Sequence, residues 1–325
     1  MSSLLSLSNL RITFDTPRGQ LAAVRGVDLE VLAGESLGVV GESGSGKTVL
    51  SRASMGLLTM STAHRTGTGV FDGQDLSTAS REAVRDTWGT GMAMIFQDPM
   101  TALNPVRRIG SQLSEGLRVR LGMSRKEAKK RSIELLQLVR IPDPEKALRK
   151  FPNQLSGGMR QRVMIAIALA CNPKLLFADE PTTALDVTVQ AQILQLLSDL
   201  RQELHMSMVL VTHDLGVVAG NTDYVAVMYA GEVVEYAPTK KLFADMRMPY
   251  TEALLESIPK VDHKSGTRLA VIAGRLPNPT DRGAGCSFAP RCKYAQEKCH
   301  KEHPELKKDP DGHLYRCWFP IGVAL

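Results

Sequence analysis

The chain has 325 residues, of which 43% are hydrophobic and 23% charged, a balance typical of a folded globular protein and not of a disordered or collagen-like chain. Its net charge of +6 comes from scattered Lys and Arg residues, so it favours no nucleic-acid partner and leaves an anionic membrane surface open. No apolar run reaches the ~18 residues of a membrane span, and the N-terminus lacks a secretory signal pattern. We therefore expect a cytoplasmic protein with reduced thiols.

The N-terminal segment alternates apolar and polar side chains from residue 7 to residue 31. This period of two predicts antiparallel strands, joined by the turn-prone sequence of residues 16–19. Phe14 is the last aromatic residue before the glycine-rich segment that follows. It could stack on a nucleotide base or simply face the core, and the sequence leaves both readings open.

A glycine-rich segment follows the apolar run 37–40 and has the pattern G-x-x-x-x-G-K-[ST]. Its glycines let backbone N–H groups point at phosphate oxygens beside the positive N-terminus of a helix, predicted to extend to about Leu58. Lys47 adds a charge for the β- and γ-phosphates, and Thr48 offers a hydroxyl to Mg²⁺. The alternative is a turn that binds nothing, but the strand-loop-helix context favours a nucleoside triphosphate. The candidate ligands are Gly41, Glu42, Ser43, Gly44, Ser45, Gly46, Lys47 and Thr48.

The middle of the chain is predicted to be mainly helical. A hairpin around residues 71–74 and an apolar strand ending at Gln97 precede a helical pattern from Ile109 to Leu148. A further helix from Arg160 to Ala170 is preceded by Ser156, a good N-cap. Gly157 and Gly158 expose backbone N–H groups at this positive helix end, which predicts a second phosphate cradle.

Two more buried strands end in polar side chains. The strand 175–180 ends in Asp179 and Glu180, and the strand 208–212 is followed by His213, with a long helix to about Leu204 between them. Strands alternating with helices predict a largely parallel α/β sheet with its site along one edge. A hairpin turning at Gly231 follows, and from Pro238 the chain becomes richer in proline, charge and cysteine.

These strand ends suggest the chemistry of ATP hydrolysis. Asp179 would hold Mg²⁺ together with Thr48, and Glu180 would act as general base on the attacking water. Gln97 could reach the metal or the water, and His213 the γ-phosphate. Each has a plainer explanation, because a lone histidine or glutamine at a strand end is usually structural.

Together these residues resemble the ATP-binding-cassette ATPase family over roughly the first 235 residues. The segment Leu155–Met159 is the specific family mark, although Met159 stands where the family usually has Gln. The resemblance implies an α/β fold with a phosphate-loop core and a mostly parallel sheet, an antiparallel β subdomain and a helical subdomain at about 98–172. It also places Asp186, after Ala184 and Leu185, at the nucleotide. The expected domains are 1–235 and a C-terminal extension, 236–325.

The resemblance also implies a mechanism. Two such domains sandwich two ATP molecules, each phosphate loop facing the partner's Ser-Gly-Gly segment. ATP closes the dimer, and hydrolysis with Glu180 as base lets it open. The region after Gln97, between residues 98 and 149, is expected to contact the membrane partner.

Several segments are similar to the D-type ATPase subunit of dipeptide and oligopeptide importers: 95–105, 179–187, 227–231, 249–251, Gly285-Cys286 and 290–292. This implies a second, related ATPase, two permease subunits, an external binding protein and a peripheral position on the cytoplasmic face of the inner membrane, with no nucleic acid. Peptide is the expected cargo, with nickel chelates, glutathione, opines and oligosaccharides as alternatives. A soluble cassette ATPase acting on DNA, ribosomes or a division complex, and an iron–sulfur regulator with a vestigial ATPase, are the competing classes.

Four of the five cysteines, Cys286, Cys292, Cys299 and Cys317, are spaced C-x5-C-x6-C-x17-C. This is neither a zinc-ribbon nor a ferredoxin pattern, but four thiols in a short proline-rich tail favour a metal. The resemblance implies a [4Fe–4S] cluster; zinc is the second choice, and free or disulfide-bonded thiols the third. Cys171 is expected to be a lone buried thiol. His300, His303 and His313 are expected at the surface.

Overall fold

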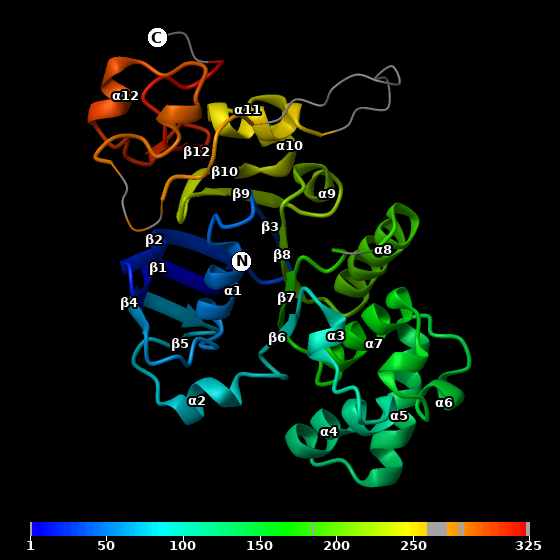
Figure 1. Ribbon diagram of the computed structural model, residues 1–325. Coiled ribbons are helices and arrows are strands. Elements are labelled where there is room, and N and C mark those ends of the chain that lie inside the picture. The colour runs from blue at the N-terminus through cyan, green and yellow to red at the C-terminus, as the bar shows by residue number, and fades with distance from the viewer. Residues whose placement is uncertain (1, 184, 259–271, 279, 281–282, 323–325) are drawn as a thin grey trace. The chain divides into compact units, whose positions relative to one another are not determined.

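The computed structural model describes residues 2–183, 185–258, 272–278, 280 and 283–322 (Figure 1). The chain forms two compact units, each assembled from separate stretches of sequence. The first unit consists of Met1–Ser2, Leu32–Glu35 and Ala79–Val209. The second consists of Ser3–Val31, Ser36–Thr78 and Leu210–Leu325. The phosphate-loop segment therefore belongs to the second unit, and the strand that ends in Asp179 belongs to the first.

The first unit is mainly helical. It contains α2 (Arg81–Asp86), β6 (Met92–Ile95), α3 (Pro99–Ala102), α4 (Ile109–Leu121), α5 (Arg125–Leu138), α6 (Pro144–Ala147), η1 (Pro152–Gln154), α7 (Gly157–Leu169), β7 (Leu175–Asp179) and α8 (Val187–Glu203). Strands β6 and β7 pair in parallel, from Met92 opposite Leu175 to Ile95 opposite Ala178, and every residue of both is buried. This confirms the two apolar strands and the parallel pairing expected from the sequence.

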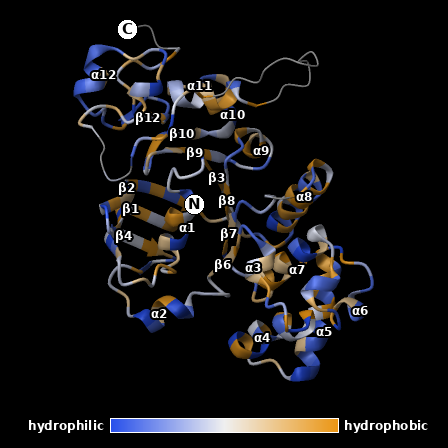
Figure 2. Cartoon of the chain, in the orientation of Figure 1, coloured by the Kyte–Doolittle hydropathy of each residue, from blue (hydrophilic) through white to orange (hydrophobic). Residues whose placement is uncertain are grey.

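Side-chain caps set where the helices of the first unit begin. Ser124 Oγ accepts from the Glu127 N–H, and the Glu127 carboxylate accepts from the Ser124 N–H, so a capping box starts α5. Helix α5 then buries Leu135 and Leu136, while its basic residues leave much of its surface hydrophilic (Figure 2). Ser156 caps α7, as predicted.

The second unit contains an antiparallel sheet with the strand order β2 (Gly19–Leu32), β1 (Ser3–Thr16), β4 (Ala63–Phe71) and β5 (Gln74–Asp75). The predicted hairpin turn is present: Phe71 pairs with Gln74, and Asp72 and Gly73 have φ of 49° and 80°. Helix α1 (Lys47–Ser54) ends before the expected Leu58, because Gly56 takes a positive φ of 67°.

The remaining strands of the second unit pair in the order β3 (Ser36–Val40), β9 (Tyr224–Tyr229), β10 (Glu232–Pro238), β12 (Leu314–Tyr315) and β11 (Lys307–Lys308). Strands β3 and β9 are parallel, and the later pairs are antiparallel. The accompanying helices are α9 (Leu215–Ala219), α10 (Thr239–Ala244), α11 (Pro249–Glu256), η2 (Ala289–Arg291) and α12 (Glu297–Lys301). Strand β8 (Ser207–Thr212) is fully buried, and the chain passes from the first unit to the second within it.

One expectation about the C-terminal histidines is wrong. His313 is completely buried, and so is Glu235. The Nε2 atom of His313 lies 2.8 Å from the Oε1 atom of Glu235, so each polar side chain has a partner inside the protein. His303 is half-buried and its Nε2 lies 3.0 Å from the Glu232 carboxylate, whereas His300 is exposed as expected. Two histidines of the polar tail thus join the tail to β10 through its carboxylates.

Among the helices that the structure describes, none combines the length and the apolar character needed to cross a bilayer. The lone thiol expected at Cys171 is indeed buried, with 8% of the residue exposed. Burial raises the pKa of this thiol, so it stays protonated and unreactive at neutral pH.

Candidate nucleotide-binding site

The phosphate loop lies between the fully buried strand β3 and helix α1. Gly46 precedes α1 with a φ of 105°, and no side chain caps the helix. A Cβ on Gly46 would come within 2.4 Å of the Ala23 carbonyl oxygen, so only glycine fits this position. Ser43 and Gly44 are exposed at the tip of the loop. An uncapped helix start beside exposed loop amides is a site for phosphate oxygens.

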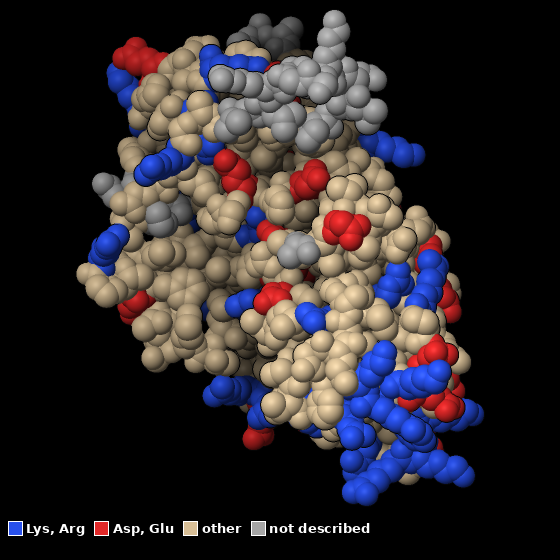
Figure 3. Space-filling view, turned by 45° about the vertical axis from the view of Figure 1, so that its right-hand side comes forward, with Lys and Arg blue, Asp and Glu red and all other residues tan. Residues whose placement is uncertain are grey.

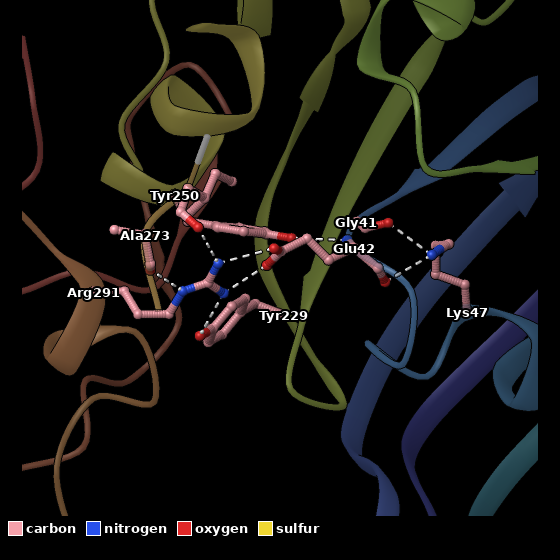
Figure 4. A network of polar contacts seen from close by, with 8 residues as sticks. Gly41, Glu42, Lys47, Tyr229, Tyr250, Ala273 and Arg291 are labelled. Atoms are coloured by element: carbon pink, nitrogen blue, oxygen red, sulfur yellow. Dashed lines mark hydrogen bonds and ion pairs between the residues drawn. The ribbon is translucent and has the colours of Figure 1, made fainter. Parts of the chain in front are cut away.

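Lys47 is buried within the loop that it is expected to serve. Its Nζ donates to the carbonyl oxygens of Gly41, at 2.7 Å, and Glu42, at 2.9 Å (Figure 4). The loop is also braced from outside, because the Gly231 N–H donates to the Ser45 carbonyl at 2.9 Å. The turn between β9 and β10, predicted only as a hairpin, therefore supports the phosphate loop.

Two residues that the sequence did not predict to be near the loop, Arg291 and Tyr250, bond to it in the structure. Arg291 forms a two-pronged salt bridge with the Glu42 carboxylate, and the Tyr250 hydroxyl accepts from the Glu42 N–H at 2.9 Å (Figure 4). The bond to Glu42 raises the pKa of Arg291, and burial raises the pKa of Tyr250, so one stays charged and the other neutral. The segments 249–251 and 290–292 carry the resemblance to importer subunits, but nothing local in either segment points to the phosphate loop, because both lie far along the chain.

In the first unit, Gln97 and Glu180 come together as their proposed roles require. Glu180 Oε2 accepts from Gln97 Nε2 at 2.9 Å and from Thr183 Oγ1 at 3.0 Å. Asp179 is the last residue of β7 and is completely buried. Glu180 takes a φ of 45°, which is uncommon for a residue other than glycine.

The Ser-Gly-Gly segment forms the N-terminus of α7. Ser156 and Gly157 are exposed, and Ser156 Oγ accepts from the Met159 N–H at 3.3 Å. A Cβ on Gly158 would lie only 3.0 Å from Val189 of α8, whose N-terminus is capped by Asp186. The glycines thus allow close packing beside α8 while leaving a helix end with its amides at the surface.

The other predicted site residues lie in the second unit. His213 is exposed directly after β8, and its neighbour Asp214 caps α9 by accepting from the Gly216 N–H at 2.8 Å. Thr48 is half-buried in the first turn of α1, and Phe14 is half-buried in β1. Their contacts with Mg²⁺, the γ-phosphate and adenine remain predictions. Ala184, part of the family motif, lies outside the described residues.

All four C-terminal cysteines line one cavity with mainly apolar neighbours, Met248, Pro249, Phe288, Ala289, Tyr294, Trp318 and Phe319. The Cys286 N–H donates to the Cys299 carbonyl at 2.8 Å. Burial raises the pKa of the thiols of Cys286 and Cys292, and that of Cys317 to about 12. Within the described part of the chain, however, no three His, Cys, Asp or Glu side chains are arranged to hold a metal ion.

Known protein families match residues in both units of the chain. Residues 24–183 match the family described as ABC transporter, and residues 234–299 match the oligopeptide/dipeptide transporter C-terminal region. The chain is 47% identical over 319 residues to the oligopeptide transport ATP-binding protein OppD of Bacillus subtilis, covering 98% of this chain and 89% of that protein. It is 46% identical over 319 residues to the dipeptide transport ATP-binding protein DppD of the same organism, covering 98% and 95%.

A solved structure is similar as well. The ATP-binding cassette MJ0796, a dimer with ADP and Pi bound, matches with a TM-score of 0.65 and 29% identity over 72% of this chain and 98% of that chain. The expected ATPase fold, with antiparallel and parallel sheets, is therefore confirmed.

Glu180→Gln tests the proposed general base. We predict that the variant still binds ATP but that turnover falls about a hundredfold or more, the scale of losing a general base. The measurement is ATP hydrolysis together with binding of a fluorescent ATP analogue. Asp199→Asn is the matched control, because it neutralises a half-buried carboxylate of the same unit that pairs with the exposed side chains of Arg140 and Gln195. Equal turnover in the Glu180 and Asp199 variants would remove Glu180 from the chemistry.

Proposed function

We propose a function for this chain on the basis of its family. The chain belongs to the ATP-binding-cassette transporters and is an ATPase of that family. Over nearly its whole length it resembles ATP-binding subunits of peptide importers. The match of residues 234–299 to the oligopeptide/dipeptide transporter C-terminal region is independent support. The proposed role is therefore to power the uptake of dipeptides or oligopeptides by hydrolysing ATP.

The proposed division of labour follows the site. Lys47 and the loop amides would bind the phosphates of ATP, while Thr48, Asp179 and Gln97 would hold Mg²⁺. Glu180 would polarise the attacking water, and His213 would contact the γ-phosphate. The observation that carries this proposal is the position of Glu180 directly after β7, with a φ of 45° and a hydrogen bond from Gln97 Nε2 at 2.9 Å. A fixed carboxylate beside a buried aspartate is what a general base next to Mg²⁺ requires.

The exposed N-terminus of α7 supports a second proposal about assembly. Ser156, Gly157 and Gly158 would meet the ATP held by the phosphate loop of a second, related ATPase subunit, with Asp186 nearby. Each ATP would then lie between two chains, and its binding would close them. Domain 1–235 would carry this site, and residues 236–325 would form an extension.

The membrane partners would meet the region between residues 98 and 149. Lys and Arg side chains gather over helices α4 and α5 (Figure 3), and one cavity there is lined by Arg108, Arg118, Arg125, Lys129 and Arg149. A basic surface suits acidic partner segments beside anionic lipid headgroups. We place the chain peripherally on the cytoplasmic face of the inner membrane, beneath two permease subunits served by an external binding protein.

A reconstituted transporter tests this function. The chain, its partner ATPase and the permeases are placed in lipid vesicles with the binding protein, and ATP hydrolysis is measured with and without peptide. We expect peptide to raise hydrolysis, and a complex carrying Glu180→Gln to show no rise. Stimulation by a nickel chelate, glutathione, an opine or an oligosaccharide instead would contradict the peptide assignment. Co-purification with nucleic acid or ribosomes and without permeases would contradict the importer itself.

We also propose that Cys286, Cys292, Cys299 and Cys317 hold a [4Fe–4S] cluster, with zinc as the alternative. Thiolates are the ligands of such clusters, and four cysteines on one sheltered cavity suit this chemistry. Because no three of the described side chains already form a metal site, binding would have to turn the thiols toward one another. The cluster would then supply a structural link across the tail.

Iron and sulfide analysis of anaerobically purified protein tests the cluster. We expect both elements in the wild-type chain and their loss in Cys292→Ser, because a cluster needs each of its ligands. Cys171→Ala is the control and should keep both, since Cys171 belongs to the other unit. Zinc in place of iron, or metal content unaffected by Cys292→Ser, would contradict the assignment.

A further inference from the structure

Glu42, inside the phosphate loop, is held through all of its polar groups. Its carboxylate oxygens accept from Arg291 Nη1 at 2.7 Å and Nη2 at 2.9 Å. Its N–H donates to the Tyr250 hydroxyl at 2.9 Å, and its carbonyl accepts from Lys47 Nζ at 2.9 Å (Figure 4). Of these three partners, Arg291 and Tyr250 come from the C-terminal part of the chain. The conformation of the loop therefore depends on residues outside it.

Arg291 is itself fixed in place. Only 3% of its side chain is exposed, and its Nε donates to the Ala273 carbonyl at 2.8 Å while Nη2 donates to the Ile272 carbonyl at 3.1 Å. The guanidinium also lies 5.9 Å from the ring centroid of Tyr229. A two-pronged pair between anchored groups is stronger than an ordinary surface ion pair.

Tyr250 is anchored as firmly as Arg291. It is completely buried in α11 and packs against Tyr229 and Phe288, with ring centroids 4.5 Å and 5.3 Å away. Phe288 belongs to the turn that leads into Arg291, whose N–H donates to the Phe288 carbonyl at 2.9 Å. Both residues that contact Glu42 therefore pack against Tyr229, and both are joined to Phe288.

We propose that Arg291 is a positioning residue of the ATP site. It does not touch the reacting atoms; it holds Glu42, and through Glu42 it holds the backbone that presents amides to the phosphates. The proposal rests on the ATP-binding role of the phosphate loop. It makes the C-terminal segment a determinant of nucleotide affinity, although that segment lies far along the chain from every phosphate-binding motif.

The same turn connects the ATP site with the thiol cavity. Arg291 is next to Cys292 in the sequence. The Cys292 N–H donates to the Ala289 carbonyl, and the Ala289 N–H donates to the Cys286 carbonyl. A change in the arrangement of these thiols would thus reach Arg291 and the phosphate loop. Because coupling between two sites is reciprocal, ATP binding should in turn stabilise residues 286–292.

Arg291→Met tests the proposal on the full-length chain at a temperature well below melting. We expect ATP to bind about tenfold more weakly, within the usual range of coupling between sites, because Glu42 loses its partner. The ATP affinity of Arg291→Lys should lie between those of the wild type and Arg291→Met, since an ammonium carries the charge but cannot form the two-pronged pair. Glu42→Gln should weaken ATP binding as much as Arg291→Met does. The double variant should bind ATP no more weakly than either single variant, because both changes remove the same pair. A second readout is hydrogen exchange at 286–292, where ATP should protect the wild type and not Arg291→Met.

Lys293→Met is the matched control. Lys293 ties the same turn to α11 through Glu252 and Glu256, each at 3.1 Å, without reaching the loop. It should keep wild-type ATP affinity and ATP-induced protection. Equal weakening in Lys293→Met and Arg291→Met, or wild-type affinity in Arg291→Met, would overturn the proposal.

Lys47→Met and Glu42→Gln keep the test decisive. Lys47→Met tests the ATP site itself: if it does not weaken ATP binding, the site assignment fails. If Lys47→Met weakens binding and Arg291→Met does not, only the positioning role fails. Should Arg291→Met not fold, Glu42→Gln decides, because it removes the same charge pair and leaves the arginine and its other contacts in place.

Discussion

A phosphate loop binds ATP only if its backbone holds one curled conformation with its amides turned inward. In this chain Lys47 holds that conformation from inside the loop, while Arg291 and Tyr250 hold it from outside through Glu42. Lys47 fastens the carbonyls of Gly41 and Glu42, while Arg291 and Tyr250 fasten the rest of Glu42. The candidate ATP site therefore depends on residues from both the N-terminal and the C-terminal parts of the sequence.

The parts of the site that could be predicted are local in sequence. The phosphate loop, the cap at Ser156 and the cap at Asp186 each depend on a few neighbouring residues whose side chains bond to nearby amides. The carboxylates at the end of β7 follow from one apolar run. For the same reason most of the expected strands and helices lie near their predicted bounds, apart from α1, which a glycine ends early. The elements after Pro238, such as α11, α12 and β12, were not predicted.

The parts that could not be predicted join distant residues. Arg291 and Glu42 are 249 positions apart, and His313 and Glu235 are 78 apart. No periodicity relates such residues, and a polar side chain in a polar tail gives no sign that it will be buried against a carboxylate. Strand pairing in the second unit brings His313 to β10, so only the folded chain reveals this contact.

We propose that each ATP is hydrolysed between two chains, with Glu180 of one and the Ser-Gly-Gly segment of the other. The most direct test measures ATP hydrolysis per chain while the concentration of chain and partner subunit is raised together. We expect the rate per chain to rise with concentration until the dimer is saturated. A rate per chain that stays constant from the lowest concentration, where the subunits are separate, would contradict it.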